Sequence, residues 1–410
     1  MSRIMVIGGG AAGMIAAVFS ARNGHEVHIF EKNEKLGKKV YITGKGRCNI
    51  TNACDPSDFI KNIVRNPKFM YSALGSFSNA DTMDFFESLG LEIKTERGQR
   101  VFPVSDHSSD VIKALERELI RLNVRIHYNS KVNSLIVEDG VLKGLIFNER
   151  DKFFGDACIV ATGGLSYPST GSTGDGYRFA KDCGHSVTKL SPSLVAIVTE
   201  ETFPKDLQGL SLKNVNIRLT KDKKVLYTET GEMLFTHFGI SGPLVLSASS
   251  YIAEEVLKGG EMPLIHLDLK PGLNEEMLEG RIIRDFSENP KKEFKNSLDK
   301  LLPKSMTGTL VELSGIEPQK QVGNISKKEI KTLVHTFKDV EFHPVKLRDY
   351  PEAIITKGGV CVNEISPKTM ESKLVKGLFF AGEVLDVDAL TGGFNLQIAW
   401  SSGYMAGNAI

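Results

Sequence analysis

Three glycines near the start of the chain have the spacing that a bound nucleotide phosphate requires. They stand in Gly8-Gly-Gly10-Ala-Ala-Gly13, which fits the pattern G-x-G-x-x-G. Gly8 permits a tight turn, Gly10 lets a pyrophosphate approach the backbone, and Gly13 lets a helix and a strand pack closely. The free N–H groups and the positive end of that helix would hold the phosphates. Glu31, about 20 residues later, is placed to accept hydrogen bonds from ribose hydroxyls.

These residues need a strand–helix–strand unit to position them, and the flanking sequence predicts one. Arg3–Ile7 is a short apolar run typical of a buried parallel strand. Residues 11–23 form a helix in this prediction, and Glu26–Phe30 is the second strand. The acid at its end disfavours a 2′-phosphate, so the unit indicates NAD or FAD.

A segment near the C-terminus favours FAD over NAD. Residues 377–383 predict a late strand that ends in a small pair and an acid, and a helix is expected from about Asn395 to Asn408. FAD enzymes of this architecture use such a strand end to meet the ribityl chain. They also place a helix N-terminus under the flavin pyrimidine, where its dipole stabilises the reduced ring. The predicted cofactor is therefore FAD.

Two middle segments agree with this prediction. Residues 156–163 predict a strand that runs into a glycine corner, which commonly passes close to the cofactor. Residues 132–138 and 141–147, joined by Asp139-Gly140, predict a β-hairpin. The start of such a hairpin often lies beside the adenine, so Val132 is the candidate backbone contact there.

Four motifs resemble a known family. They are Thr43–Asn52 (TGKGRCNITN), Ser169–Tyr177 (STGSTGDGY), Phe235–Pro243 (FTHFGISGP), and Ala381–Asp386 (AGEVLD) with Gly392–Gln397 (GGFNLQ). They are similar to those of the bacterial FAD-dependent oxidoreductases called HI0933-like or BaiN-like, also named aminoacetone oxidase-type flavoproteins. The match runs in order from Ile4 to Gly403. The family loop usually has glycine where this chain has Lys45, and glycine is also usual where Ala389 stands.

The resemblance implies an α/β protein with three parts. Residues 1–190 and 346–410 would form a Rossmann-like FAD-binding domain, of the glutathione-reductase type but without a separate NAD domain. Residues 191–271 and 336–345 would form a β-rich, barrel-like domain, because short apolar stretches alternate there. Residues 272–335 would form a helical insert, since apolar residues recur at helical spacing.

The Thr43–Asn52 loop has residues apt for a cofactor site. Gly44 and Gly46 allow close backbone approach, Arg47 could neutralise charge on the cofactor or an anionic substrate, and Asn49 could bond the ring edge. Cys48 is either a redox partner of the flavin or a small packed residue. The full set of expected FAD contacts is Gly8, Gly10, Ala11, Ala12, Gly13, Glu31, Lys32, Thr43, Gly44, Gly46, Arg47, Cys48, Asn49, Val132, Ala161, Thr162, Gly163, Gly382, Glu383, Gly393, Asn395, Leu396 and Gln397.

Composition excludes several classes of protein. Fifty-one basic and fifty acidic residues give a net charge of +1, so no global field indicates nucleic acid or an anionic membrane. Five cysteines without a C-x-x-C pair argue against a disulfide framework or a structural zinc site, and no other metal is expected. No apolar run reaches the roughly 20 residues of a membrane span. We therefore expect a cytoplasmic protein with a small-molecule substrate, and the sequence does not indicate its oligomeric state.

The expected reaction is hydride transfer from NAD(P)H, a transient electron donor, through FAD to an activated carbon–carbon double bond. Candidate proton donors are Tyr167, Asp175 and His237, and a histidine could protonate an enolate near neutral pH. His237 beside Phe238 could equally be structural. Three alternatives stay open: an oxidase or dehydrogenase of a small amine, a reductase of uridine in RNA, and a redox-sensing binding module without turnover.

Overall fold

The computed structural model describes all residues from 1 to 410, and the chain divides into two compact units. Unit 1 comprises residues 1–193 and 349–410, and unit 2 comprises residues 194–348. Unit 2 is therefore an insertion in unit 1. Its two limits each fall three residues beyond the boundaries expected after residues 190 and 345.

Unit 1 contains both helices and strands. They are β1 (Arg3–Ile7), α1 (Ala11–Arg22), β2 (Glu26–Phe30), α2 (Lys38–Ile42), β3 (Thr51–Asn52), α3 (Pro56–Lys61), β4 (Ile63–Arg65), α4 (Tyr71–Ser76), α5 (Asn79–Ser88), β5 (Ile93–Glu96), β6 (Arg100–Pro103), α6 (Ser108–Arg121), β7 (Arg125–His127), β8 (Val132–Glu138), β9 (Val141–Phe147), β10 (Asp151–Phe154), β11 (Ala157–Val160), α7 (Asp175–Asp182), β12 (Ser191–Ser193), β20 (Ile355–Lys357), β21 (Leu378–Phe380), β22 (Asp388–Ala389) and α13 (Phe394–Asn408).

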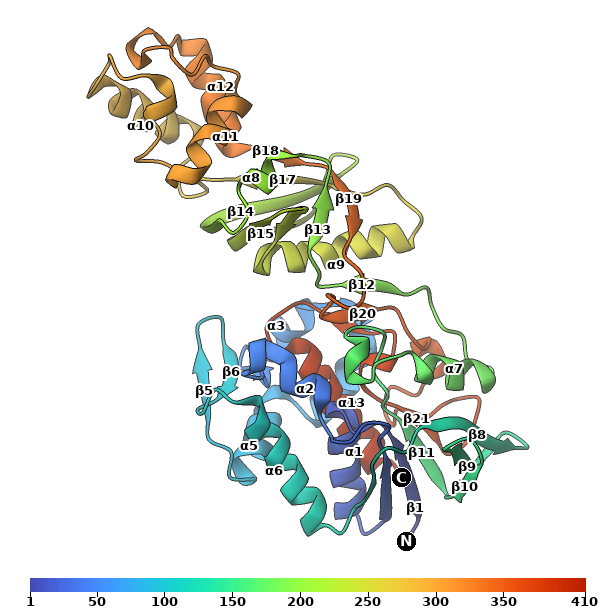
Figure 1. Ribbon diagram of the computed structural model, residues 1–410. Coiled ribbons are helices and arrows are strands. Elements are labelled where there is room, and N and C mark those ends of the chain that lie inside the picture. Colours follow the sequence, from blue (N-terminus) through green and yellow to red (C-terminus); the bar gives the residue numbers. More distant parts are fainter. The chain divides into compact units, whose positions relative to one another are not determined.

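A five-stranded parallel sheet forms the centre of unit 1, with the strand order β21-β11-β1-β2-β7 (Figure 1). The three inner strands are buried over almost their whole length, as expected for a parallel sheet. Because all five strands run the same way, their carboxyl ends meet at one edge, where α/β proteins of this kind bind ligands. The Rossmann-like α/β fold predicted from the sequence is confirmed.

Helices α1 and α13 pack closely against each other in unit 1. Their contact depends on two glycines of α13: a methyl group on Gly403 would lie 2.5 Å from the carbonyl oxygen of Ala12, and one on Gly407 would lie 2.5 Å from that of Ala16. The hydroxyl of Ser20 donates to the carbonyl of Gly407. The predicted late strand and final helix therefore return to the first βα unit.

Smaller sheets complete unit 1. Strands β8, β9 and β10 form an antiparallel sheet, and β8 and β9 have the bounds predicted for the hairpin. Strands β3, β6 and β5 form a second antiparallel sheet, and β22–β4 and β12–β20 are two-stranded pairs. One continuous apolar core, all of it within unit 1, joins the β8-β9-β10 sheet to the parallel sheet.

Unit 2 consists mainly of longer antiparallel strands and a group of helices. Its elements are β13 (Ile197–Thr199), α8 (Phe203–Asp206), β14 (Ser211–Lys221), β15 (Lys224–Thr236), β16 (Gly239–Ser241), α9 (Pro243–Leu257), β17 (Leu264–Asp268), α10 (Glu275–Ser287), α11 (Lys304–Ser314), α12 (Lys327–Lys338), β18 (Val340–Phe342) and β19 (Pro344–Leu347).

The seven-stranded sheet of unit 2 closes on itself. Its strand order is β18-β17-β14-β15-β16-β13-β19, so β18 and β19 are the first and last strands. A flat sheet would hold them about 28 Å apart, six spacings of about 4.7 Å. A single residue, His343, joins them in the chain, so the Cα atoms of Phe342 and Pro344 are at most about 7 Å apart. The sheet must therefore curl into the barrel-like form that the sequence predicts.

Helices α10, α11 and α12 lie where the helical insert was predicted. Asn274 caps α10, and Ser326 forms a capping box with Glu329 at the start of α12. Helix α9 was not predicted within the β-rich residues 191–271. Its apolar residues are buried against β15, and Gly242-Pro243 supplies a helix start signal.

None of these helices has the length and hydropathy that crossing a lipid bilayer demands.

Candidate functional site

The glycine-rich turn after β1 has the geometry of a phosphate site. Gly8 has a φ of +100°, and a methyl group on Gly13 would lie 1.9 Å from the carbonyl oxygen of Gly8. Around Gly10, by contrast, no atom lies within 4 Å of the position of such a methyl group. Gly10 is the N-cap of α1 and provides no side-chain cap. The start of α1 therefore has room beside Gly10 and no side-chain cap, as an anion bound to the first N–H groups would require.

Glu31, at the end of β2, holds this turn in place. Its Oε2 accepts from the backbone N–H of Gly9 at 2.8 Å, and its Oε1 accepts from the backbone N–H of Asn33 at 2.8 Å. The side chain is buried. The carboxylate is thus fixed beside the phosphate turn, and its contact with a ribose stays a prediction.

The loop from Thr43 to Asn49 follows a left-handed path. Gly44, Lys45 and Gly46 have φ values of +56°, +58° and +85°. Glycine adopts this conformation freely, whereas a residue with a side chain pays about 1–2 kcal/mol. This cost is the physical reason for the usual glycine at position 45, and here the Lys45 side chain is exposed.

Arg47 is committed to acidic partners within unit 1. Its guanidinium contacts the carboxylates of Glu96 and Asp106 and lies 4.1 Å from the ring centre of Phe102. These carboxylates, Glu96 first, raise the pKa of Arg47. Its charge is already matched, so we remove Arg47 from the groups proposed to neutralise the cofactor.

Cys48 and Asn49 differ in what they offer to a ligand. Burial raises the pKa of the Cys48 thiol to about 12, so the thiol is protonated at neutral pH. This favours the packed interpretation of Cys48 over the redox one. The Oδ1 atom of Asn49 is buried and has no hydrogen-bond partner. A buried acceptor without a partner costs about 1–3 kcal/mol, and a flavin N–H would satisfy it.

The start of α13 has the character expected of a helix under a flavin. Gly393 is its N-cap, with a φ of +98° and no side-chain cap, and the first turn holds no acid. Gly393 lies against Thr51, whose carbonyl oxygen would be 2.4 Å from a methyl group there. Ala389 is not in the left-handed region, so the usual glycine is not required at that position.

Two predicted residues of α13 are occupied by protein partners. Gln397 is fully buried: its Oε1 accepts from the Thr51 hydroxyl at 2.6 Å and its Nε2 donates to the Phe77 carbonyl at 3.2 Å. We therefore remove Gln397 from the proposed cofactor contacts. The amide of Asn395 bonds both the N–H and the carbonyl of Ala389, which shapes the turn before the helix.

A cluster of four residues links four segments of unit 1: Lys39 in α2, Ser166 after β11, Thr356 in β20 and Glu383 after β21. Lys39 donates to Glu383 Oε2 and to Ser166 Oγ, both at 2.6 Å. Glu383 Oε1 accepts from the Ser166 hydroxyl and the backbone N–H of Thr356, both at 2.8 Å. We call this the Lys39 cluster. Only Glu383 was predicted as a site residue, because its three partners share no local motif with it.

The three predicted proton donors do not share one environment. Burial alone would raise the pKa of Asp175, but the Lys32 ammonium at 2.6 Å and the Thr173 hydroxyl hold it below the ordinary value. Asp175 is thus a carboxylate at neutral pH, which argues against its predicted role as a proton donor. Burial raises the pKa of the half-buried Tyr167, with Glu352 adding to the effect, so this phenol stays protonated. His237 is exposed and belongs to unit 2, and its catalytic role stays a prediction.

The other predicted contacts lie mostly in turns at the carboxyl edge of the sheet. Ala161, Thr162 and Gly163 directly follow β11, and the carbonyl oxygen of Ala161 would be 2.6 Å from a methyl group on Gly8. Gly382 begins a 3-10 turn after β21. The remaining predicted contacts are Ala11 and Ala12 in α1, Lys32 after β2, Thr43 after α2, Val132 at the start of β8 and Leu396 in α13.

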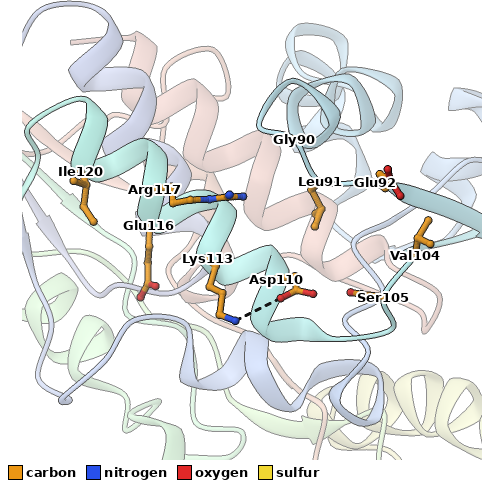
Figure 2. A pocket seen from close by; sticks show the side chains of 10 residues that line it. All are labelled: Gly90, Leu91, Glu92, Val104, Ser105, Asp110, Lys113, Glu116, Arg117 and Ile120. Carbon is orange, nitrogen blue, oxygen red and sulfur yellow. Dashed lines mark ion pairs between the residues drawn. The ribbon is translucent and has the colours of Figure 1, made fainter.

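A surface hollow of unit 1 contains none of the predicted site residues. It is lined by the loop after α5, by Val104 and Ser105, and by one face of α6, and it has a volume of about 740 Å³. Figure 2 shows Lys113 pointing to Asp110 across one turn of α6, with 3.7 Å between the ammonium and the carboxylate. The hollow is thus separate from the candidate cofactor residues described above.

The residues of unit 1 fit FAD. The open space at Gly10 and the uncapped start of α1 suit the phosphates. The uncapped start of α13 suits a negatively charged reduced ring. The unpartnered Asn49 Oδ1 could accept a hydrogen bond from a ring N–H. Glu383 and its donors stand at the end of β21, where the ribityl chain was expected.

Comparison with known proteins agrees with this geometry. The model of the HI0933-like protein Rossmann domain matches residues 2–409. The chain belongs to the HI0933-like family. As a member of this family it is an FAD-dependent oxidoreductase.

Two relatives of this HI0933-like protein match over nearly their whole length. It is 34% identical to the 3-dehydro-bile acid delta(4,6)-reductase of Clostridium scindens, over 100% of this chain and 99% of the relative. It is also 34% identical to the ribosomal RNA dihydrouridine synthase of Haemophilus influenzae, over 98% and 97% of the two chains.

Solved structures share the fold of this HI0933-like protein. The 3-ketosteroid delta1-dehydrogenase of Sterolibacterium denitrificans is 14% identical with a TM-score of 0.52, over 99% of this chain and 98% of that one. The 3-ketosteroid-delta4-(5alpha)-dehydrogenase of Rhodococcus jostii is 15% identical with a TM-score of 0.51, over 100% and 96%. At these identities the likeness concerns the fold alone.

Proposed function

We propose that this protein reduces a carbon–carbon double bond that is conjugated to a carbonyl group, with FAD as cofactor and NAD(P)H as electron donor. The observation that carries the proposal is the full-length match, at 34% identity, to a relative named as a delta(4,6)-reductase. The relative named as a dihydrouridine synthase also forms a product with a saturated ring bond. Reduction of a polarised double bond is the chemistry that the two names share.

The chain's own residues would bind the cofactor and supply a proton. FAD, when bound, supplies the two-electron chemistry. The start of α1 would bind the phosphates, and the start of α13 would favour negative charge on the reduced ring. Tyr167 would hold the proton on its phenolic oxygen until the α-carbon of the substrate needs it, since its pKa lies above the ordinary value.

The test begins with the purified holoprotein under anaerobic conditions. NADH and NADPH are added separately while flavin absorbance is followed, and we expect one of them to bleach the flavin. A steroid 4,6-dien-3-one is then added, and we expect the absorbance to return as the double bond is reduced. If neither nicotinamide bleaches the flavin, the proposed donor is wrong. If no conjugated carbonyl compound reoxidises the reduced flavin, the proposed reaction is wrong.

The same experiment separates the small-molecule substrate from RNA. Two relatives named as ribosomal RNA dihydrouridine synthases are 34% and 32% identical to this chain. Flavin reoxidation by unmodified ribosomal RNA, together with binding that weakens steeply with salt, would support the RNA substrate. Reoxidation by oxygen with rapid peroxide release would instead favour an amine oxidase. We favour the small molecule because the net charge of +1 offers no general attraction for RNA.

A further inference from the structure

Lys39 is a cation beside the glycine-rich turn, and it lies outside the four family motifs. It lies in α2, eight residues after Glu31, and its side chain is about one-fifth exposed. Its ammonium makes two hydrogen bonds, to Glu383 and Ser166. An ammonium has three N–H donors, so one donor is still available for a ligand.

The chain before Lys39 fixes this residue next to the glycine-rich turn. The backbone N–H of Gly37 donates to the carbonyl of Gly9 at 2.8 Å. The side chain of Leu36 lies over Gly9, with its Cδ2 atom 2.2 Å from where a methyl group on Gly9 would be. Lys39 follows two residues later, so the start of α2 is attached directly to the phosphate turn.

The partners of Lys39 come from the other side of that turn. In the sheet order β21-β11-β1-β2-β7, Ser166 follows β11 and Glu383 follows β21, whereas Lys39 follows β2. The turn after β1 lies between them. The Lys39 side chain therefore connects loops on both sides of the glycine-rich turn that the phosphates would occupy.

The charges at this edge of the sheet indicate what Lys39 could bind. The pyrophosphate of FAD carries about two negative charges, and Glu383 brings another carboxylate to the same edge of the sheet. Arg47 is held by two carboxylates, those of Glu96 and Asp106, whereas Lys39 has a single carboxylate partner and one ammonium N–H left for a phosphate. We infer that Lys39 is the counter-charge of the FAD pyrophosphate, and that Glu383 and Ser166 hold its ammonium in position. The inference rests on FAD binding and not on the substrate proposed above.

The test measures ligand affinity on apoprotein without any turnover. FAD and ADP-ribose, which has the pyrophosphate but no flavin, are titrated separately. We expect Lys39→Met to weaken both ligands by about ten- to a hundredfold, the range for one charge-assisted hydrogen bond. Lys39→Arg should restore most of the affinity. Lys38→Met is the matched control, because Lys38 pairs with the exposed Glu34 and should change neither affinity.

A background variant separates a direct contact from a structural one. The Glu383→Gln variant lacks the carboxylate charge that pairs with Lys39. If Lys39 served only to neutralise Glu383, replacing Lys39 in this background would not change ligand affinity. We expect Lys39→Met to weaken ADP-ribose in this background too. No effect there would overturn the inference.

Two other outcomes would also overturn it. One is unchanged affinity of Lys39→Met for both ligands, and the other is weaker binding of FAD with unchanged binding of ADP-ribose, which would move the charge to the flavin ring. Melting temperatures of the apoproteins show whether each variant is folded, and Lys39→Gln, which also removes the charge, replaces Lys39→Met if that variant does not fold. No substrate or electron donor is used, so a failed reductase assay leaves this result standing.

Discussion

Tyr167 and Asp175 lie eight residues apart, but their surroundings give them opposite protonation states. Burial keeps the phenol of Tyr167 protonated, while Lys32 and Thr173 keep Asp175 as a carboxylate despite its burial. A proton donor must carry its proton at the working pH. Among the predicted donors of unit 1, Tyr167 alone meets this condition.

Replacing Tyr167 should therefore affect turnover more than binding. We expect Tyr167→Phe to lower kcat by about 100- to 10,000-fold, the usual contribution of a general acid, and to leave the affinity for FAD unchanged. Asp175→Asn is the control, with an expected loss below about tenfold on the same reasoning. Stopped-flow reoxidation of the reduced flavin by the enone isolates the step concerned. Equal rates for wild type and Tyr167→Phe would exclude this tyrosine.

The cysteines provide a second prediction about single residues. Burial raises the pKa of Cys48 to about 12 and also raises that of Cys158, whereas Cys361 is partly exposed. Thiolates are the reactive form, so iodoacetamide at pH 8 should label Cys361 in the native protein and spare the two buried thiols. Mass spectrometry of the labelled peptides gives the answer. Rapid labelling of Cys48 would reopen its redox interpretation.

The site residues divide into those that sequence could identify and those that it could not. Gly8, Gly10 and Gly13 were found because their spacing is itself the physical requirement of the turn. Lys39 and Glu383 are 344 residues apart, and nothing local in either segment indicates the other. The acidic partners of Arg47 were not foreseen for the same reason, because Glu96 is 49 residues away.

At the scale of elements, Gly10 and Gly13 at the start of α1 should respond differently to replacement by alanine. Gly10→Ala meets no protein atom, so the apoprotein should keep its melting temperature, but the new methyl group would fill the space proposed for the pyrophosphate. Gly13→Ala would clash with the carbonyl of Gly8 and should cost about 1–3 kcal/mol of stability or more. Thermal unfolding and FAD titration of both variants test this. If Gly10→Ala binds FAD normally, the phosphates lie elsewhere.

The edge pair β2–β7 should make stability depend on pH. His28 Nδ1 lies 2.9 Å from His127 Nε2, and burial lowers the pKa of both imidazoles below 6.5. The unfolded chain then binds protons first as the pH falls below 6.5, so the free energy of unfolding decreases from there down to the folded pKa values. The free energy of unfolding is measured with denaturant between pH 7.5 and 5.5 for the wild type and for a His28→Gln, His127→Gln variant. We expect it to depend less on pH in the variant.

His343 in unit 2 serves as the opposite control. Its pKa is raised, first by the hydrogen bond to Glu201 at 2.7 Å. Its contribution to stability is present below 6.5 and is lost as the pH rises through the folded pKa. His343→Gln should therefore remove stability at the low end of the pH range. A His28→Gln, His127→Gln variant with an unchanged slope would contradict the assignment to that pair.

At the scale of the whole molecule, the insertion of unit 2 predicts that unit 1 can stand alone. All residues of its continuous apolar core belong to residues 1–193 and 349–410. A chain in which a short Gly-Ser linker replaces residues 194–348 should unfold cooperatively. It should also bind FAD within about tenfold of the affinity of the full chain. Loss of FAD binding in a folded unit 1 would show that unit 2 contributes to the cofactor site.

Sequence patterns described the two units unequally. In unit 1, β1, β2 and the hairpin strands β8 and β9 have the predicted bounds, β11 and β21 lie within longer predicted segments, and the edge strand β7 was not predicted. In unit 2, α9 was missed because apolar residues such as Leu244, Val245 and Ala248 satisfy a short strand as well as a helix. The pairing partners of β18 and β19 could not be predicted from the sequence either, because β18 reaches β17 and β19 reaches β13 only when the sheet curls.

The single-residue joint at His343 has a consequence for synthesis of the chain. β19 completes the barrel by pairing with β13, and in that pairing Thr199 lies opposite Pro344, 145 residues later. A ribosome adds about 5–20 residues per second, so β13 waits roughly 7–30 s for its partner. During that interval the seam of the nascent barrel is an open strand edge, the kind of surface that recruits chaperones or invites misassembly. The helical insert is made within the same interval, so lengthening it would lengthen the exposure.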